Sequence, residues 1–241
     1  MKIELEKKFH NDAFSDNRRS ILNKYYLSTS SARSFYKGLI SSFSKNKRVL
    51  EYGCGPGSEI LSLADHASQV YAIDISEVAI EKAQLQAHAE KKKINFSVMN
   101  AESLLFNEDS LDLVFGSGIL HHLDIHKSYA EISRVLGKTG CAIFFEPLGH
   151  NPVINLFRKL TPNLRTADEH PLLINDLEMA NNYFYDVDVK YFNLFSTIGS
   201  FLPFLTKSLS ILDSIIFNKL PYMKKYAWIC VITLKNPRKL N

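Results

Sequence analysis

The sequence predicts an α/β protein in which a largely parallel sheet is covered by helices on both faces. Two observations carry this prediction. Strand-like and helix-like segments alternate regularly between residues 48 and 146, as right-handed β-α-β crossovers require. The runs VYAI, LDLVF and CAIFF are apolar throughout, which is typical of parallel strands that are buried on both sides.

The composition of the 241 residues fits one globular domain with a full core. Hydrophobic residues make up 46% and charged residues 22% of the chain, which excludes a disordered or collagen-like protein. The formal net charge of +4 is spread along the sequence, so nucleic acid is not expected as a partner. Cys54, Cys141 and Cys230 have no metal-ligand spacing. We therefore expect reduced core thiols, no metal site and a cytoplasmic location.

Five strands are predicted in the first part of the chain, after a helical segment at 12–43. The strands are expected at 48–52, 69–74, 94–99, 111–115 and 141–146, with helices at 57–67, 76–91 and 124–136. Ser76 is expected to cap the second of these helices, because its hydroxyl can accept from the first turn.

The regular alternation ends after residue 146. A loop at 147–171, a helix at 174–182 and strands at 185–192 and 227–234 are expected, and the two strands should form an antiparallel hairpin. An apolar insertion between them carries a helical stripe, formed by Leu205, Leu209, Leu212, Ile216 and Leu220. We expect this stripe to pack on the sheet or on the N-terminal helices. The alternative is that it lines an apolar pocket or makes peripheral contact with a membrane.

A glycine-rich turn, EYGCGPGSE, follows the first strand. Glycines allow a tight turn and a close approach to a ligand, and the helix behind them offers unpaired N–H groups. The pattern is G-x-G-x-G, and Ser58 occupies the position where a dinucleotide fold requires its third glycine. Glu51, just before the turn, suits a ligand with an ammonium group better than a pyrophosphate. The other interpretation is a tight β-α connection without a ligand.

Polar residues follow the next two strands as well. Asp74 ends the second strand, where a carboxylate can accept from the hydroxyls of a ribose. Asn100, Ala101 and Glu102 follow the third strand, at a place where a polar side chain can reach an adenine edge. Asp74 by itself could form only an Asx turn before Ser76. Three such features at successive strand ends favour a nucleoside site in the crevice of the sheet.

The motifs VLEYGCGPG, YAIDIS, NAE, LDLVFGSGILHHL and a strand ending in EP together resemble the class I S-adenosylmethionine-dependent methyltransferases of the type 11 group, over residues 45–147. The resemblance implies a Rossmann-like sheet of seven strands, the last antiparallel, and S-adenosylmethionine as cofactor. It divides the single domain into an N-terminal helical lid (1–44), a cofactor-binding core (45–147) and a substrate side (148–241).

The same resemblance implies a role for individual residues. Glu51 and the loop residues Gly53, Cys54, Gly55 and Gly57 would surround the methionine part of the cofactor. Asp74 would hold the ribose and Ile75 would pack on the adenine. Ala101 and Glu102 would contact the amino edge of the base, and Ser117 and Gly118 would lie near the sulfonium.

Candidate acid-base residues cluster after the fourth and fifth strands. A hydroxyl acceptor needs a general base within hydrogen-bond reach, whereas an amine needs little more than desolvation. The catalytic candidates are His122, Glu146, His150 and His170, with His121, Asn151, Arg165, Asp168 and Glu169 nearby in the sequence. For each there is a plainer alternative: the paired histidines could pack at a helix start, Glu146 could end a strand, and the loop charges could be solvated.

The expected function is methyl transfer to an oxygen or nitrogen of a small, partly apolar acceptor, which includes hydrophobic or lipid-like molecules. A methyltransferase-like binding protein without turnover is the main alternative. A nicotinamide-dependent oxidoreductase is disfavoured because Ser58 breaks its glycine pattern. An amino-methyltransferase of nucleic acid is disfavoured because Gly116-Ser117-Gly118 stands where an acidic or Asn-Pro-Pro-aromatic element would hold the flipped base.

Overall fold

The computed structural model describes residues 27–57, 59–161, 170–200 and 202–239, together with Glu4, Lys7, Lys8, Asn11 and Asp12. Of the helix expected at 12–43, the part at 13–26 lies outside the described residues. The remainder is helix α3 (Ser30–Ser44), which follows a 3-10 turn at Leu27–Thr29. Arg165, Asp168 and Glu169 also lie outside the described residues.

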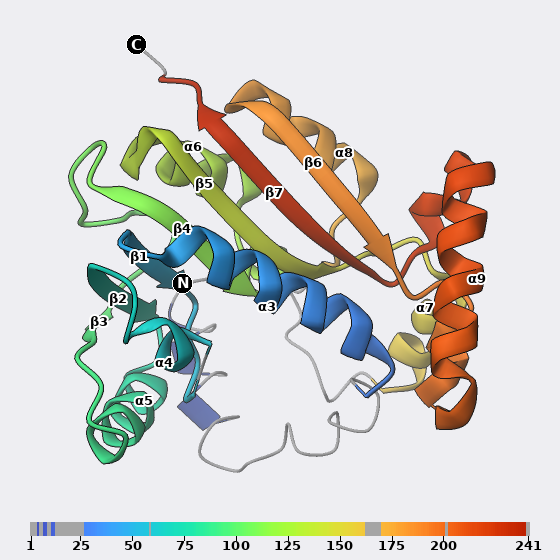
Figure 1. The fold of residues 1–241 in the computed structure, drawn as a ribbon, viewed down its shortest axis with the longest axis horizontal. Coiled ribbons are helices and arrows are strands. Elements are labelled where there is room, and N and C mark those ends of the chain that lie inside the picture. Colours follow the sequence, from blue (N-terminus) through green and yellow to red (C-terminus); the bar gives the residue numbers. More distant parts are fainter. Residues whose placement is uncertain are drawn as a thin grey trace.

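The sheet has seven strands in the order β3-β2-β1-β4-β5-β7-β6 (Figure 1). Five strands run parallel, and β7 pairs antiparallel with both β5 and β6. This confirms the Rossmann-like sheet with an antiparallel last strand. The strands are β1 (Arg48–Tyr52), β2 (Gln69–Asp74), β3 (Asn95–Val98), β4 (Leu111–Ser117), β5 (Leu136–Pro147), β6 (Phe184–Phe192) and β7 (Ile229–Pro237).

Two apolar cores lie on opposite faces of this sheet, because successive strand residues point to opposite sides. Leu113, Phe115 and Phe145 pack with Tyr36 of α3, whereas their neighbours such as Val114 and Phe144 join the other core. Helices α3, α4 (Ile60–Leu63) and α5 (Glu77–Ala89) contribute to the first core, and α6 (Ile125–Val135) and α8 (Ile174–Met179) to the second. All three cysteines are free thiols and buried, as expected.

Local capping rules explain two helix starts that the sequence predicted. Ser76 accepts from the Ala79 N–H at the start of α5, and Asp124 accepts from His126 and Lys127 at the start of α6. The helix expected at 57–67 is much shorter, since α4 spans only Ile60–Leu63. The predicted strand at 141–146 begins earlier, because Leu136 already pairs with Leu111, and the register with β4 shifts between Leu111 and Leu113.

The loop expected at 147–171 contains a helix, α7 (Pro152–Leu160), so that part of the prediction is wrong. Asn151 caps α7, because its side chain accepts from the Val153 and Ile154 N–H groups, and Pro152 occupies the first turn. The Asn-Pro pair was therefore a helix start signal.

The insertion between β6 and β7 is helical, but only part of the predicted stripe is covered, since Leu205, Leu209 and Ile216 are half-buried. In α9 (Thr206–Lys219) the buried residues are Asp213 and Phe217, whereas Leu212 and Leu220 of the predicted stripe are exposed. The Asp213 carboxylate accepts from the backbone N–H groups of Leu194 (3.0 Å), Phe195 (2.8 Å) and Ser196 (3.1 Å). Helix α9 is thus anchored by a carboxylate that satisfies a turn, which hydrophobic periodicity does not reveal.

Candidate active site

The glycine loop turns sharply at the end of β1. Gly53 and Gly55 have φ of +74° and +57°, a region that side-chain-bearing residues rarely adopt. The N–H groups of Gly53 and Cys54 donate to the Ile73 carbonyl of β2, at 3.0 and 2.9 Å. A Cβ on Gly53 would lie 2.7 Å from Cγ1 of Ile119. The loop therefore depends on glycine at this position for both backbone conformation and space.

Two carboxylates hold this loop from either side. The Glu51 carboxylate is buried and accepts from the N–H groups of Glu59 (3.3 Å) and Ile60 (3.0 Å), at the start of α4. Asp74 accepts from Gly55 N–H through Oδ2 (2.8 Å) and from Ser76 N–H through Oδ1 (2.9 Å). The Asx turn considered for Asp74 is therefore present, and the same carboxylate also holds the glycine loop.

A cavity of about 490 Å³ opens above the loop. Six of the residues expected at the cofactor line it: Glu51, Gly53, Cys54, Gly55, Gly57 and Ser117. Burial raises the pKa of the Cys54 thiol, so this residue forms a neutral wall of the cavity. The volume is within the range of small-ligand sites.

Helix α3 supplies two cations to this cavity that the sequence reasoning missed. Lys37 Nζ lies 2.8 Å from Glu59 Oε2, and Arg33 Nη1 lies 3.4 Å from Glu59 Oε1. The guanidinium of Arg33 also lies 5.1 Å from the centre of the Phe145 ring. Arg33 and Lys37 are four residues apart, so they share one helix face, but the sequence does not show that this face meets the glycine loop.

Tyr36 of the same helix is another residue that the sequence reasoning missed. Its hydroxyl is fully buried and has no hydrogen-bond partner among the residues that the structure describes. Burial, and then the charges of Glu51, Glu59 and Glu146, raise the pKa of Tyr36 well above its ordinary value. The hydroxyl is therefore a neutral donor close to these carboxylates.

The residues expected at the adenosine lie at the ends of β2 and β3, outside the lining of this cavity. Ile75 is half-buried and Ala101 is buried. Tyr52 Oη donates to the Ala101 carbonyl at 2.5 Å, and Glu102 Oε1 accepts from Asp124 N–H at 2.8 Å. These contacts fix the segment after β3 against β1 and against the start of α6.

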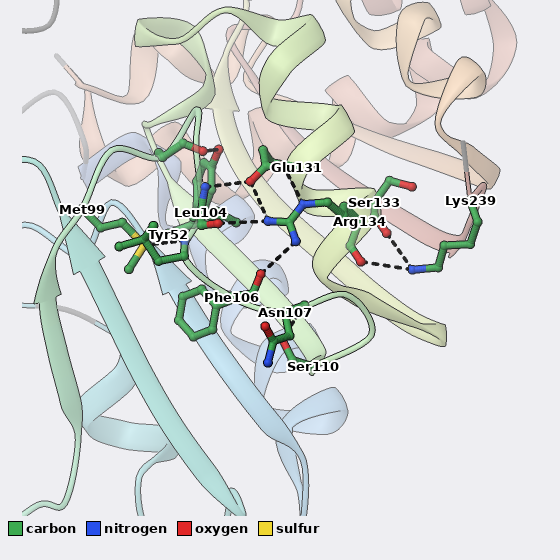
Figure 2. A network of polar contacts seen from close by, with 12 residues as sticks. Tyr52, Met99, Leu104, Phe106, Asn107, Ser110, Glu131, Ser133, Arg134 and Lys239 are labelled. Carbon is green, nitrogen blue, oxygen red and sulfur yellow. Dashed lines mark hydrogen bonds and ion pairs between the residues drawn. The ribbon is translucent and has the colours of Figure 1, made fainter. Parts of the chain in front are cut away.

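Figure 2 shows how the rest of that segment is held. Arg134 of α6 donates to the carbonyls of Leu104 (2.9 Å) and Phe106 (2.8 Å) and pairs with Glu131 at 2.7 Å. Glu131 in turn accepts from Leu104 N–H at 2.7 Å. The hydrogen bond from Arg134 lowers the pKa of Glu131, so the pair is ionised at neutral pH.

A buried carboxylate–histidine pair lies where β4 and β5 end. Glu146 is fully buried, and its Oε1 accepts from the N–H groups of Ile119 (2.8 Å) and Leu120 (2.9 Å). Its Oε2 lies 2.7 Å from Nδ1 of His121. A carboxylate on Nδ1 places the proton there and leaves the lone pair on Nε2, the tautomer of a general base. His121 is also close to Gly118, whose added Cβ would lie 3.7 Å from Cε1.

The other catalytic candidates have different surroundings. His122 is buried, and its ring stacks against that of His121 at 4.1 Å. His150 is half-buried, and its Nε2 accepts from Ile174 N–H at 3.4 Å, at the start of α8. His170 is exposed, and its backbone N–H donates to the His121 carbonyl at 3.2 Å. The structure thus brings Glu146 together with His121 rather than with His122, His150 or His170.

No group of three His, Cys, Asp or Glu side chains in the described ranges gathers closely enough to hold a metal ion. The cavity above the glycine loop is lined by the carboxylates of Glu51 and Glu59 and by the cations Arg33 and Lys37.

Comparison with known proteins bears on this geometry. Residues 50–144 match a family model described as a methyltransferase domain. An uncharacterized protein of Haemophilus influenzae is 30% identical over 127 residues, 48% of this chain and 51% of that protein. The ubiquinone biosynthesis O-methyltransferase of Bordetella pertussis is 31% identical over 112 residues, 46% of each chain. The matched part of the chain spans about half the length of these curated relatives.

Solved structures extend the likeness to most of the chain. Phosphoethanolamine N-methyltransferase 2 of Haemonchus contortus, in complex with phosphomonomethylethanolamine and S-adenosylhomocysteine, superposes with a TM-score of 0.67 at 18% identity, over 95% of this chain and 60% of that one. Geranyl diphosphate C-methyltransferase from Streptomyces coelicolor gives 0.62 at 13% identity, over 86% and 79%. At these identities the likeness is one of fold.

Proposed function

We propose that this chain is a class I S-adenosylmethionine-dependent methyltransferase that transfers a methyl group to an oxygen or nitrogen atom of a small, partly apolar acceptor. The observation that carries the proposal is the glycine loop, held by Glu51 and Asp74 beneath a cavity of about 490 Å³. The catalytically silent binding protein remains the second hypothesis, and the turnover assay described below separates the two.

The charges around the loop suit the amino and carboxyl groups of the methionine part of the proposed cofactor. Arg33 and Lys37 offer cations to a carboxylate, and Glu51 and Glu59 offer carboxylates to an ammonium group. Gly53 and Gly55 let the backbone approach the ligand because no Cβ intervenes.

The nucleoside half of the cofactor would lie toward the ends of β2 and β3. We assign the ribose hydroxyls to Asp74, the adenine face to Ile75 and the amino edge to Ala101 and Glu102. Ser117 and Gly118 then border the sulfonium, which supplies the methyl group for an in-line displacement. The fixed segment after β3 supports this assignment, because preformed contacts reduce the entropy lost on binding.

His121 is proposed as the general base, and Glu146 as the residue that positions it. When the acceptor is a hydroxyl, Nε2 of His121 takes the proton as the oxygen attacks, and the buried Glu146 stabilises the resulting imidazolium. His121 thus takes the catalytic role that the sequence analysis expected for His122. His150 and His170, which follow β5, remain second candidates and are tested by the same assay.

The names of one relative and one structural neighbour favour a small acceptor with an apolar part. One relative is named an O-methyltransferase of ubiquinone biosynthesis, and one structural neighbour is a geranyl diphosphate C-methyltransferase, whose named substrate is small and partly apolar. We therefore propose an acceptor with an apolar portion and one methylated heteroatom.

Two measurements on the purified chain test the proposal. Calorimetric titration with S-adenosylhomocysteine should show binding, and the melting temperature should rise with ligand concentration. Transfer of a labelled methyl group from S-adenosylmethionine to a panel of hydroxylated and amino acceptors with apolar tails should show turnover. Absence of binding at saturating ligand contradicts the cofactor assignment, and binding without turnover on the whole panel favours the silent binding protein.

A further inference from the structure

We propose that helices α7 and α9 form a docking face for an anionic lipid surface. This inference rests on the surface of the C-terminal third and not on the proposed activity. No helix in the described part of the chain is long and apolar enough to cross a membrane. The proposed contact is therefore peripheral, with side chains entering the interface between headgroups and acyl chains.

The first observation is the orientation of α7. Its exposed large hydrophobic residues are Val153, Leu156 and Leu160, at spacings of three and four, so they share one face of the helix. Ile154 is the only residue of this helix that is buried. An amphipathic helix on a protein surface normally turns its apolar face inward, whereas α7 presents apolar side chains on its outer face.

The second observation is that the insertion between β6 and β7 also exposes apolar side chains. Phe204, Ile211 and Ile215 are exposed, and they line a hollow of about 660 Å³ between α9 and α3. Twelve of the eighteen exposed large hydrophobic residues in the described ranges lie in α7 or between Phe195 and Tyr222. These apolar side chains are therefore concentrated in one part of the chain.

The two helices belong to one end of the molecule. Figure 1 draws α7 and α9 at the same end of the longest axis. The Asn151 side chain, which caps α7, donates to the carbonyl of Tyr226 at the end of the insertion (2.9 Å). A single flat partner can therefore contact both.

The charged residues of α7 and of the insertion indicate an anionic partner. Residues 152–161 and 192–226 contain six basic residues and one acidic residue: Arg158, Lys159, Lys207, Lys219, Lys224, Lys225 and Asp213. Asp213 is buried and bonded to three backbone N–H groups, so no acidic side chain of these two stretches faces solvent. The stretches sum to +5, and because the whole chain is +4, the remaining residues sum to −1.

Apolar side chains flanked by lysines and arginines, without exposed acids, match a membrane surface that contains anionic lipids. Helix α3 borders both the hollow beside α9 and the cavity of the proposed cofactor site. Ser30 and Ser34 line the hollow, while Arg33 and Lys37 of the same helix line the cavity above the glycine loop. An acceptor with an apolar tail, held at the membrane, would thus be close to α3.

The test is flotation of the full chain with vesicles of phosphatidylcholine alone or with about one quarter phosphatidylglycerol. We expect binding to the anionic vesicles, at least tenfold weaker binding to neutral ones, and release at high salt because the attraction is screened. Equal binding to both vesicles, or no binding to either, overturns the proposal.

Two matched pairs of variants locate the face. Leu160→Asp should reduce vesicle binding at least fivefold, whereas Leu85→Asp in α5 should not, although the two leucines are 72% and 71% exposed. Lys207→Glu should weaken binding to anionic vesicles, whereas the same charge reversal at Lys93 should have a smaller effect. Equal effects within either pair overturn the assignment of the face.

Two readouts separate this inference from the proposed function. Binding of S-adenosylhomocysteine without vesicles should be unchanged in Leu160→Asp and Lys207→Glu. Vesicle binding by a chain that does not bind S-adenosylhomocysteine would contradict the proposed function and leave the docking face supported. Light scattering that shows a stable dimer, disrupted by Leu160→Asp but not by Leu85→Asp, would assign the face to a second copy of the chain and overturn the lipid proposal.

Discussion

The cofactor half of the molecule, from β1 to the end of β5, differs from the part that follows Pro147. In the first half, carboxylates at strand ends bond to nearby loops: Asp74 to Gly55 and Glu51 to the start of α4. In the second, the bonding carboxylate, Asp213, lies within helix α9 and accepts from the turn that follows β6, and apolar side chains of α7 and α9 are exposed. The comparison shows that carboxylates fix the loops at the strand ends in the first part, whereas the second part leaves apolar helix faces exposed.

The largest effect should come from His121→Ala. If His121 is the base, the rate of methyl transfer to a hydroxyl acceptor should fall by roughly 10²–10⁴, with binding of S-adenosylhomocysteine retained. Glu146→Gln should also lower the rate, by a smaller factor, because a neutral amide stabilises the imidazolium of His121 less than a carboxylate does. The matched variant His150→Ala should retain most turnover. An equal loss in His150→Ala and none in His121→Ala would move the base to the loop after β5.

Asp213→Ala should destabilise the part of the chain that follows Pro147 and leave cofactor binding by the first part unchanged. Removing this carboxylate leaves three backbone N–H groups without their acceptor, so we expect a loss of about 3 kcal/mol in the free energy of unfolding. Limited proteolysis should then cut within 194–226 first, while affinity for S-adenosylhomocysteine is kept. A uniform loss of cofactor binding would show that the halves are coupled more tightly than proposed.

Gly53→Ala should destabilise the protein and weaken cofactor binding. The added Cβ requires a strained φ and lies against Ile119, so we expect about 2–3 kcal/mol of destabilisation together with weaker cofactor binding. Gly38→Ala in α3 is the control, because nothing lies within 4 Å of its Cβ and alanine favours a helix. Chemical denaturation should therefore show opposite signs for the two variants. A Gly53→Ala variant with unchanged stability would contradict the close approach of Gly53 to Ile119.

Asp74→Ala should weaken binding of S-adenosylhomocysteine by roughly 1–3 kcal/mol, because the ribose hydroxyls and Gly55 N–H lose an acceptor. Titration calorimetry measures the change. Asp112→Ala, at the opposite end of β4 and paired with Arg48, is the control and should leave the affinity unchanged. An unaltered dissociation constant in Asp74→Ala removes this residue from the proposed cofactor site.

The smallest effect concerns the contribution of Glu131 to stability at acidic pH. The folded-state pKa of Glu131 is lowered by Arg134, so its contribution is present above the ordinary pKa of about 4.5 and is lost as the pH falls through the folded value. Because the pair is partly exposed, we expect less than about 1 kcal/mol. The stability difference between the wild type and Glu131→Gln should therefore shrink as the pH falls below about 4.5 and vanish once the pH is below the folded-state pKa of Glu131. A difference that persists there would assign the effect to packing.

Most of the sheet could be predicted from the sequence, because alternating periodicity, glycine turns and caps are local properties of the chain. Ser76, Asp124 and the runs of β2, β4 and β5 specify their elements within a few residues. The glycine loop could be predicted for the same reason, and six of the expected cofactor residues meet at one cavity. Helix α7 was missed although Asn151-Pro152 is a local signal.

Tertiary structure decided which distant groups meet. His121 and Glu146 are 25 residues apart and become partners because β4 and β5 are neighbours in the sheet and end at the same edge. Arg33 and Lys37 reach the cavity only because α3 packs across β4 and β5. Asp213 was hidden within an apolar stripe, since periodicity reports burial of apolar surface and not the hydrogen-bond demand of a turn elsewhere. Local patterns therefore determined the strands and the loop, and packing between elements determined the chemistry.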